Sequence, residues 1–144
     1  MAVSEFNLNW LALNIKTEYD AVIFFQTHNI IRKSKLCSNK HKMKIKCDRK
    51  YVYWNCQRKP CKNVRISVRK DTWLEGSKLE LKQILQFIFS WTFEYTSCKF
   101  GKQELHVSNA TTITFNNYLR EVSNKLCVAL LYYIRLINNN SLLG

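Results

Sequence analysis

The feature that most constrains this 144-residue chain is a pair of short metal-ligand motifs with fourteen residues between them. The first motif is Cys37-x₃-His41 and the second is Cys56-x₄-Cys61. Thiolates and imidazoles are the ligands of closed tetrahedral zinc sites, in which two tight turns are brought together by the segment between them. We therefore predict a structural Zn²⁺ site of four ligands, Cys37, His41, Cys56 and Cys61, with no open position for catalysis.

The segments around these motifs alternate apolar and polar residues as strands do. Met43–Cys47, Tyr51–Asn55 and Val64–Arg69 each show this pattern, and three short strands carrying two metal-binding turns are typical of a zinc ribbon. Cys47 lies inside the first of these strands and outside both motifs, so we expect it to be a small packing residue.

A second interpretation of the cysteines stays open. The usual knuckle of a zinc ribbon is Cys-x-x-Cys, and neither motif has that spacing. Cys56 and Cys61 would then be ordinary buried thiols, and His41 would belong to a solvated basic run.

Positive charge is concentrated around the same motifs. The formal net charge is +13, and fifteen of the 23 Lys and Arg residues lie between Arg32 and Lys70, together with only one of the ten acids, Asp48. Such a patch attracts polyanions, with nucleic acid as the first candidate, an anionic membrane surface as the second and a merely solvated face as the third. We see no signal peptide and no stretch long enough to span a membrane, which favours a reducing compartment over a disulfide scaffold for the six cysteines.

The remaining sequence has helical periodicity. Thr17–Asp20 and Ser77–Glu80 both fit a capping box, which predicts one helix over residues 17–31 and a second, core helix from residue 77. A short helix is expected over Ser97–Leu105, and after a turn a longer one with Ser108 as its N-cap. The apolar face of this last helix has a helical spacing and comprises Phe115, Leu119, Val122 and Leu126.

The last two helices form a candidate helix-turn-helix, in which the second helix enters the major groove of DNA. Its polar residues are expected to contact bases and phosphates, and they are Asn109, Thr111, Thr112, Asn116 and Arg120. The basic residues expected to neutralise phosphates are Lys42, Lys44, Lys46, Arg49, Lys50, Arg58, Lys59, Lys62, Arg65 and Arg69. A helical hairpin with a polar outer face is the alternative for these two helices.

Several motifs occur in a fixed order along most of the chain. They are Cys37-x₃-His41-x-Met43, Tyr53-Trp54-x-Cys56-x₄-Cys61, Ser67-x-Arg69-x₂-Thr72-Trp73-x-Glu75-Gly76-Ser77, Ile88-x₂-Trp91, Tyr95-x-Ser97, Lys102-x-Glu104-Leu105-x₂-Ser108, Thr111 and Asn116-x-Tyr118-Leu119-Arg120-Glu121-Val122. On these motifs, the chain from about Thr17 to about Leu126 resembles the N-terminal half of Merlin-type transposases, the animal relatives of the ISXO-like bacterial insertion-sequence transposases.

The resemblance implies a zinc-binding and helix-turn-helix region that recognises the terminal inverted repeats of a mobile element. In the family this region precedes an RNase H-like domain that cuts and joins DNA with a carboxylate triad and divalent metal ions. Here Glu121 is the last acid of the sequence, so the converging carboxylates of two-metal chemistry are missing. We expect a truncated transposase fragment that is not an enzyme.

Together these observations predict an α+β fold, with a small zinc-ribbon β lobe followed by a helical helix-turn-helix region. The expected divisions are an N-terminal helical segment (1–32), a basic zinc-ribbon-like lobe (33–76), the helix-turn-helix region (77–126) and an apolar C-terminal tail (127–144). The expected function is zinc-stabilised binding of double-stranded DNA in the nucleus, with a second copy or full-length transposase as a further partner and no membrane. The alternative is a protein-interaction module that dimerises with full-length transposase, and a basic secreted protein with three disulfides is a third possibility.

Overall fold

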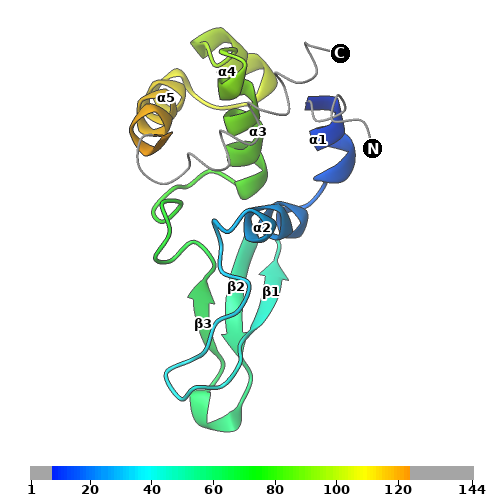
Figure 1. Cartoon of the computed structure of the whole chain (residues 1–144), viewed down its shortest axis with the longest axis vertical. Coiled ribbons are helices and arrows are strands. Elements are labelled where there is room, and N and C mark those ends of the chain that lie inside the picture. Colours follow the sequence, from blue (N-terminus) through cyan, green and yellow to red (C-terminus); the bar gives the residue numbers. More distant parts are fainter. Residues whose placement is uncertain (1–7, 124–144) are drawn as a thin grey trace. The chain divides into compact units, whose positions relative to one another are not determined.

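The computed structural model describes residues 8–123, and these residues form an α+β fold (Figure 1). The elements in chain order are α1 (Leu8–Asn14), α2 (Glu18–Thr27), β1 (Lys44–Asp48), β2 (Tyr51–Cys56), the short 3₁₀ helix η2 (Lys59–Cys61), β3 (Val64–Ser67), α3 (Leu81–Thr92), α4 (Cys98–Glu104) and α5 (Asn109–Ser123). The predicted fold class is confirmed. The C-terminal tail predicted for residues 127–144 lies outside the described residues.

The chain divides into two compact units. One comprises residues 16–81 and holds α2 and the three strands, and the described parts of the other are residues 8–15 and 82–123, which hold α1, most of α3, α4 and α5. The predicted N-terminal segment 1–32 is therefore divided between the two units, because α2 belongs with the sheet.

The sheet is antiparallel with the order β1-β2-β3. Ile45 pairs with Trp54 and Trp54 with Ile66, so an apolar row crosses all three strands on one face. Val52 and Trp54 are buried on this face, and α2 contacts β2. Cys47, predicted to pack in β1, is exposed instead, because it lies near the end of the strand.

The capping box at the start of α2 is confirmed. The Thr17 hydroxyl accepts a hydrogen bond from the Asp20 amide, and the Asp20 carboxylate accepts one from the Thr17 amide. Hydrogen bonds from Thr17 lower the pKa of the Asp20 carboxyl below its ordinary value. The helix ends earlier than predicted, at Thr27, and the buried Ile31 lies beyond it.

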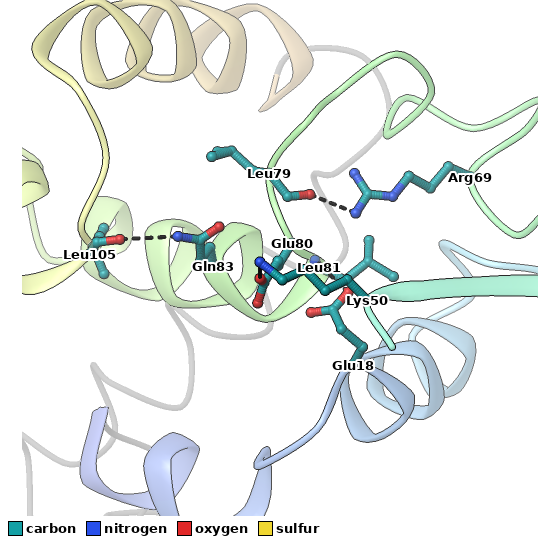
Figure 2. Close-up of polar contacts among 8 residues, drawn as sticks. All are labelled: Glu18, Lys50, Arg69, Leu79, Glu80, Leu81, Gln83 and Leu105. Atoms are coloured by element: carbon teal, nitrogen blue, oxygen red, sulfur yellow. Dashed lines mark hydrogen bonds and ion pairs between the residues drawn. The ribbon is translucent and has the colours of Figure 1, made fainter. Parts of the chain in front are cut away.

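The capping box predicted at Ser77 is wrong, since α3 begins four residues later, at Leu81. The Glu80 carboxylate pairs with the Lys50 ammonium at 3.0 Å, and the Leu81 amide donates to the buried carboxylate of Glu18 at 2.9 Å (Figure 2). A carboxylate at a helix N-terminus accepts a hydrogen bond from an amide that has no partner within the helix, and its negative charge is attracted to the positive end of the helix dipole. The helix thus begins at an acid supplied by α2, a contact that local sequence does not reveal.

α3 is the core element of its unit, as predicted. Leu81, Ile84, Leu85 and Ile88 follow the helical spacing and are almost fully buried. Phe87, on another side of the helix, is also buried. Its ring packs edge-on against the ring of Phe115 in α5, with 5.3 Å between the two ring centroids.

α4 and α5 form the predicted pair of helices with a short turn. Ser97 caps α4 by accepting from the Phe100 amide, and Ser108 accepts from the Thr111 amide in the first turn of α5. The helices cross closely where Gly101 of α4 meets Thr112 of α5, because a Cβ atom on Gly101 would overlap the Thr112 hydroxyl. The absence of a side chain at Gly101 therefore sets how closely the two helices approach.

Candidate metal centre and basic surface

The predicted ligand set comes together in space. Cys37, His41, Cys56 and Cys61 each offer one ligand atom, and these four atoms lie within 4.8 Å of one another. The three thiols are buried and the imidazole is half-buried. Three soft sulfur ligands and one imidazole converging in a buried site can hold a metal ion.

The first two ligands belong to a tight turn before the sheet. Leu36 and Lys42 form an isolated antiparallel bridge that closes this turn, and the Cys37 amide donates to the His41 carbonyl at 3.0 Å. Lys40 adopts a left-handed conformation with φ of 62°, which reverses the chain. The reversal brings the His41 amide to 3.4 Å from the Cys37 sulfur, so a backbone donor faces one ligand.

The other two ligands lie on either side of a second turn. Cys56 is the last residue of β2 and Cys61 the last residue of η2, where Pro60 occupies an early helical position and suits the short 3₁₀ turn. The Cys61 amide closes this turn by donating to the Arg58 carbonyl at 2.9 Å. The longer spacing of this motif accommodates the 3₁₀ helix, which a two-residue spacer cannot contain.

The distances between ligand atoms are those of reduced thiols around a common centre. The Cys37 and Cys61 sulfurs are 3.7 Å apart, whereas a disulfide bond measures about 2.0 Å. His41 Nδ1 lies 3.3 Å from the Cys61 sulfur and 3.9 Å from that of Cys56. All five cysteines in residues 8–123 are free, so no bonded pair of a disulfide scaffold occurs in that part of the chain.

The surroundings act differently on two of the thiols. Burial raises the pKa of Cys37, but hydrogen bonds from the His41 and Asn39 amides and from neighbouring thiols lower it further, and the net pKa is below the ordinary value. A hydrogen bond from Asn39 lowers the pKa of Cys61, but burial and the neighbouring Cys56 and Cys37 raise it more, and its net pKa is above the ordinary value. The Cys37 thiol therefore has a lower pKa than the Cys61 thiol.

Asn39 is a residue of the site that the sequence analysis missed. Its side-chain amide donates to the Cys61 sulfur at 3.3 Å, which links the first turn to a ligand on the second. Groups that hydrogen-bond to metal ligands orient them and tune their basicity. Its position between the two ligands of the first motif is the only sequence signal for this role.

The basic residues predicted to contact phosphates lie mainly at the surface. Those with exposed side chains are Lys42, Lys44, Arg49, Lys50, Arg58, Lys59, Lys62 and Arg65, and Lys46 is half-buried. Lys50 is engaged by Glu80, which raises the pKa of its ammonium group.

Arg69 differs from these residues, because its guanidinium is engaged inside the fold, and its phosphate contact stays a prediction. Its guanidinium is partly buried and donates to the Ser77 carbonyl at 2.8 Å. It also donates to the Leu79 carbonyl at 2.6 Å (Figure 2). Burial lowers the pKa of Arg69, opposed by the negative charges of Glu18 and Glu80. The side chain fixes the loop that precedes α3.

Two of the residues predicted to contact bases make side-chain hydrogen bonds within the protein itself. Thr112 is fully buried and its hydroxyl donates to the Ser108 carbonyl at 3.0 Å, so its prediction as a base contact is wrong. Asn116 is half-buried, accepts a hydrogen bond from the Thr96 hydroxyl and donates one to the Thr96 carbonyl. Asn109 and Arg120 are exposed, and Thr111 is half-buried with its hydroxyl bonded to Ser108.

The exposed residues of α5 that the sequence analysis did not select are Ala110, Ile113, Thr114, Asn117 and Glu121. At about 100° per residue, Asn109, Ile113, Asn117 and Arg120 project within about 80° of one another. These four residues form the outer face of α5.

Comparison of the chain with protein-family models, with curated proteins and with solved structures finds no match. Within residues 8–123, every helix is too short or too polar to cross a membrane.

Proposed function

We propose that this protein is a zinc-stabilised DNA-binding module of the transposase type, which recognises the ends of a mobile element. The observation that carries the proposal is the Cys₃His cluster, which lies in the same unit as a series of exposed Lys and Arg side chains, most of them in the turns next to the three strands. The sequence resemblance to Merlin-type transposases supplies the identity of the DNA target.

Three thiolates and one imidazole are a ligand set that zinc accepts in closed structural sites. Tetrahedral zinc has bonds of about 2.3 Å to sulfur and 2.0–2.1 Å to nitrogen, which place two sulfurs about 3.8 Å apart and a sulfur and a nitrogen about 3.5 Å apart. The corresponding separations here are 3.7 Å between Cys37 and Cys61 and 3.3 Å between His41 and Cys61. Four protein ligands close the coordination sphere, so the ion stabilises the fold and does no chemistry.

The two units would contribute differently to DNA binding. Basic side chains beside the metal centre neutralise phosphates and supply affinity without regard to sequence. The outer face of α5 carries the amides of Asn109 and Asn117, the apolar Ile113 and the guanidinium of Arg120. Amides and guanidinium groups hydrogen-bond to base edges, and an apolar side chain contacts the thymine methyl group. This face replaces the predicted set that included Thr112 and Asn116.

A salt titration of duplex binding tests this division. Arg58→Ala with Lys59→Ala removes two exposed charges next to the metal centre. Loss of two phosphate contacts should lower the slope of log K against log salt by about 1.8, equally on element-end and scrambled duplexes. Asn117→Ala should weaken binding to the element end by about 1–3 kcal/mol and leave the scrambled duplex unaffected.

The control is Lys78→Ala with Lys99→Ala, which removes two exposed charges outside the basic lobe and α5 and should leave the slope unchanged. Equal slopes for both double mutants would contradict a localised phosphate-binding surface. A parent protein that binds neither duplex at low salt would instead favour the interaction-module alternative.

A further inference from the structure

The two faces of the three-stranded sheet differ in character. Paired residues of an antiparallel sheet lie on the same face, and the faces alternate along each strand. The row Ile45–Trp54–Ile66 therefore lies on one face, and the neighbouring row Lys46–Tyr53–Ser67 lies on the other. The second face, called here the polar sheet face, comprises Lys44, Lys46, Asp48, Tyr51, Tyr53, Asn55, Arg65 and Ser67, all exposed or half-buried except Asn55, which is 3% exposed.

The polar sheet face displays aromatic rings between positive charges. Tyr51 is 76% exposed, although tyrosine in a strand normally packs its ring. The Arg65 guanidinium lies over the Tyr53 ring at 4.8 Å from its centroid, which holds a second flat group in place. Lys44 is exposed beside them, and Asp48 is the only acid on this face.

We propose that the polar sheet face binds a single-stranded segment of nucleic acid, with one base stacked on Tyr51 and another on the Arg65–Tyr53 pair. Stacking on aromatic and guanidinium groups, next to cations that follow the backbone, is the general mode by which proteins hold single strands. The inference rests on the proposed nucleic-acid-binding function and assigns it a second site, which shares Lys44, Lys46 and Arg65 with the basic surface.

The geometry selects an unpaired strand over a duplex. Alternate residues of a strand are about 6.7 Å apart, about twice the 3.4 Å rise between stacked bases of a DNA strand. Bases laid on positions 51 and 53 must therefore be separated from each other. In a duplex the base faces are covered by their neighbours and cannot reach a ring on a flat sheet.

The test is fluorescence anisotropy with a labelled oligothymidine of about 12 nucleotides, within the usual site size of single-strand binders. Tyr51→Ala should weaken this binding roughly fivefold to a hundredfold, since one stacked base is lost. Tyr51→Phe keeps the ring and should change the affinity less than about twofold, and both variants should bind duplex as the parent does. The matched control is Tyr19→Ala, which removes an exposed tyrosine of α2 and should have no effect.

Each outcome separates this inference from the proposed function. Unchanged oligothymidine binding by Tyr51→Ala, or a loss in Tyr51→Phe as large as in Tyr51→Ala, overturns stacking on Tyr51. Equal weakening of single-strand and duplex binding by Tyr51→Ala overturns the proposed selection of an unpaired strand over a duplex. A parent that binds the duplex but not oligothymidine overturns the inference and leaves the proposed function intact. Oligothymidine binding that depends on the Tyr51 ring, without preference for an element-end duplex, supports the inference while the proposed function fails.

Discussion

Replacing Gly101 with alanine tests whether the close approach of α4 and α5 depends on the missing side chain. The added Cβ would overlap the Thr112 hydroxyl, and the Thr112 Cβ and Cγ2 atoms are each only 3.3 Å away. Rotating the threonine side chain would move its buried hydroxyl away from the Ser108 carbonyl and break that hydrogen bond. Backbone movement is also restrained, since the Gly101 amide donates to Ser97 and its carbonyl accepts from Leu105 and Val107.

Two opposing effects decide the sign of the change. Alanine is favoured over glycine inside a helix by about 0.5–1 kcal/mol. Inserting an extra methyl group into a packed contact costs about 1–3 kcal/mol, and here the neighbour is fully buried. The difference between these ranges is about 0–2.5 kcal/mol, so we expect Gly101→Ala to lower the free energy of unfolding of this unit by about 1 kcal/mol.

The assay is urea unfolding of the zinc-loaded protein, combined with hydrogen exchange of the α5 amides, because the two units need not unfold together. The control is Gln103→Ala, an exposed change on the same helix that should stay within about 0.5 kcal/mol of the parent. In a Thr112→Ala background, the cost of Gly101→Ala should fall, because the overlapping hydroxyl is gone. Gly101→Ala protein that is more stable than the parent would refute the close-packing argument.

Three further predictions concern the sheet-containing unit. Cys37→Ser or Cys61→Ser should abolish binding of about one Zn²⁺ per chain and unfold the lobe, whereas Cys98→Ser should do neither, as measured by metal analysis and circular dichroism. Arg69→Lys should lower the unfolding free energy by about 1–3 kcal/mol, because lysine cannot serve both carbonyls, and unchanged stability would contradict that role. The lowered pKa of Asp20 contributes stability that is present above the ordinary Asp pKa and is lost as the pH falls through the lowered one. Asp20→Asn should therefore flatten the acid side of the stability profile, and a profile identical to that of the parent would be evidence against the capping contribution.

The Cys₃His cluster was predictable because its four members are close in sequence within each turn and chemically distinctive. Cys37 and His41 share one turn, and Cys56 and Cys61 share the other, so spacing alone identified all four. The strands between them were predictable from alternation, since one face of the sheet is buried. Asn39 was missed because amide side chains near turns are common and only the folded geometry points this one at a sulfur.

The errors arose where side-chain polarity was used as a substitute for exposure. Thr112 is polar but buried, since its hydroxyl bonds to the carbonyl four residues earlier and needs no water. Ile113, next to it, is apolar but 54% exposed on the outer face of α5. Arg69 is charged, but its guanidinium donates hydrogen bonds to two backbone carbonyls inside the fold, which a count of basic residues cannot detect.

The start of α3 shows why long-range contacts limit prediction from local signals. Ser77 and Glu80 have the spacing of a capping box, but Glu80 pairs with Lys50 and the first helical amide is taken by Glu18, 63 residues earlier. A buried carboxylate on a helix amide gives a stronger, charge-assisted hydrogen bond than a serine hydroxyl. The helix therefore begins where the tertiary acid reaches it, and a capping motif predicts a helix start only where no such partner competes.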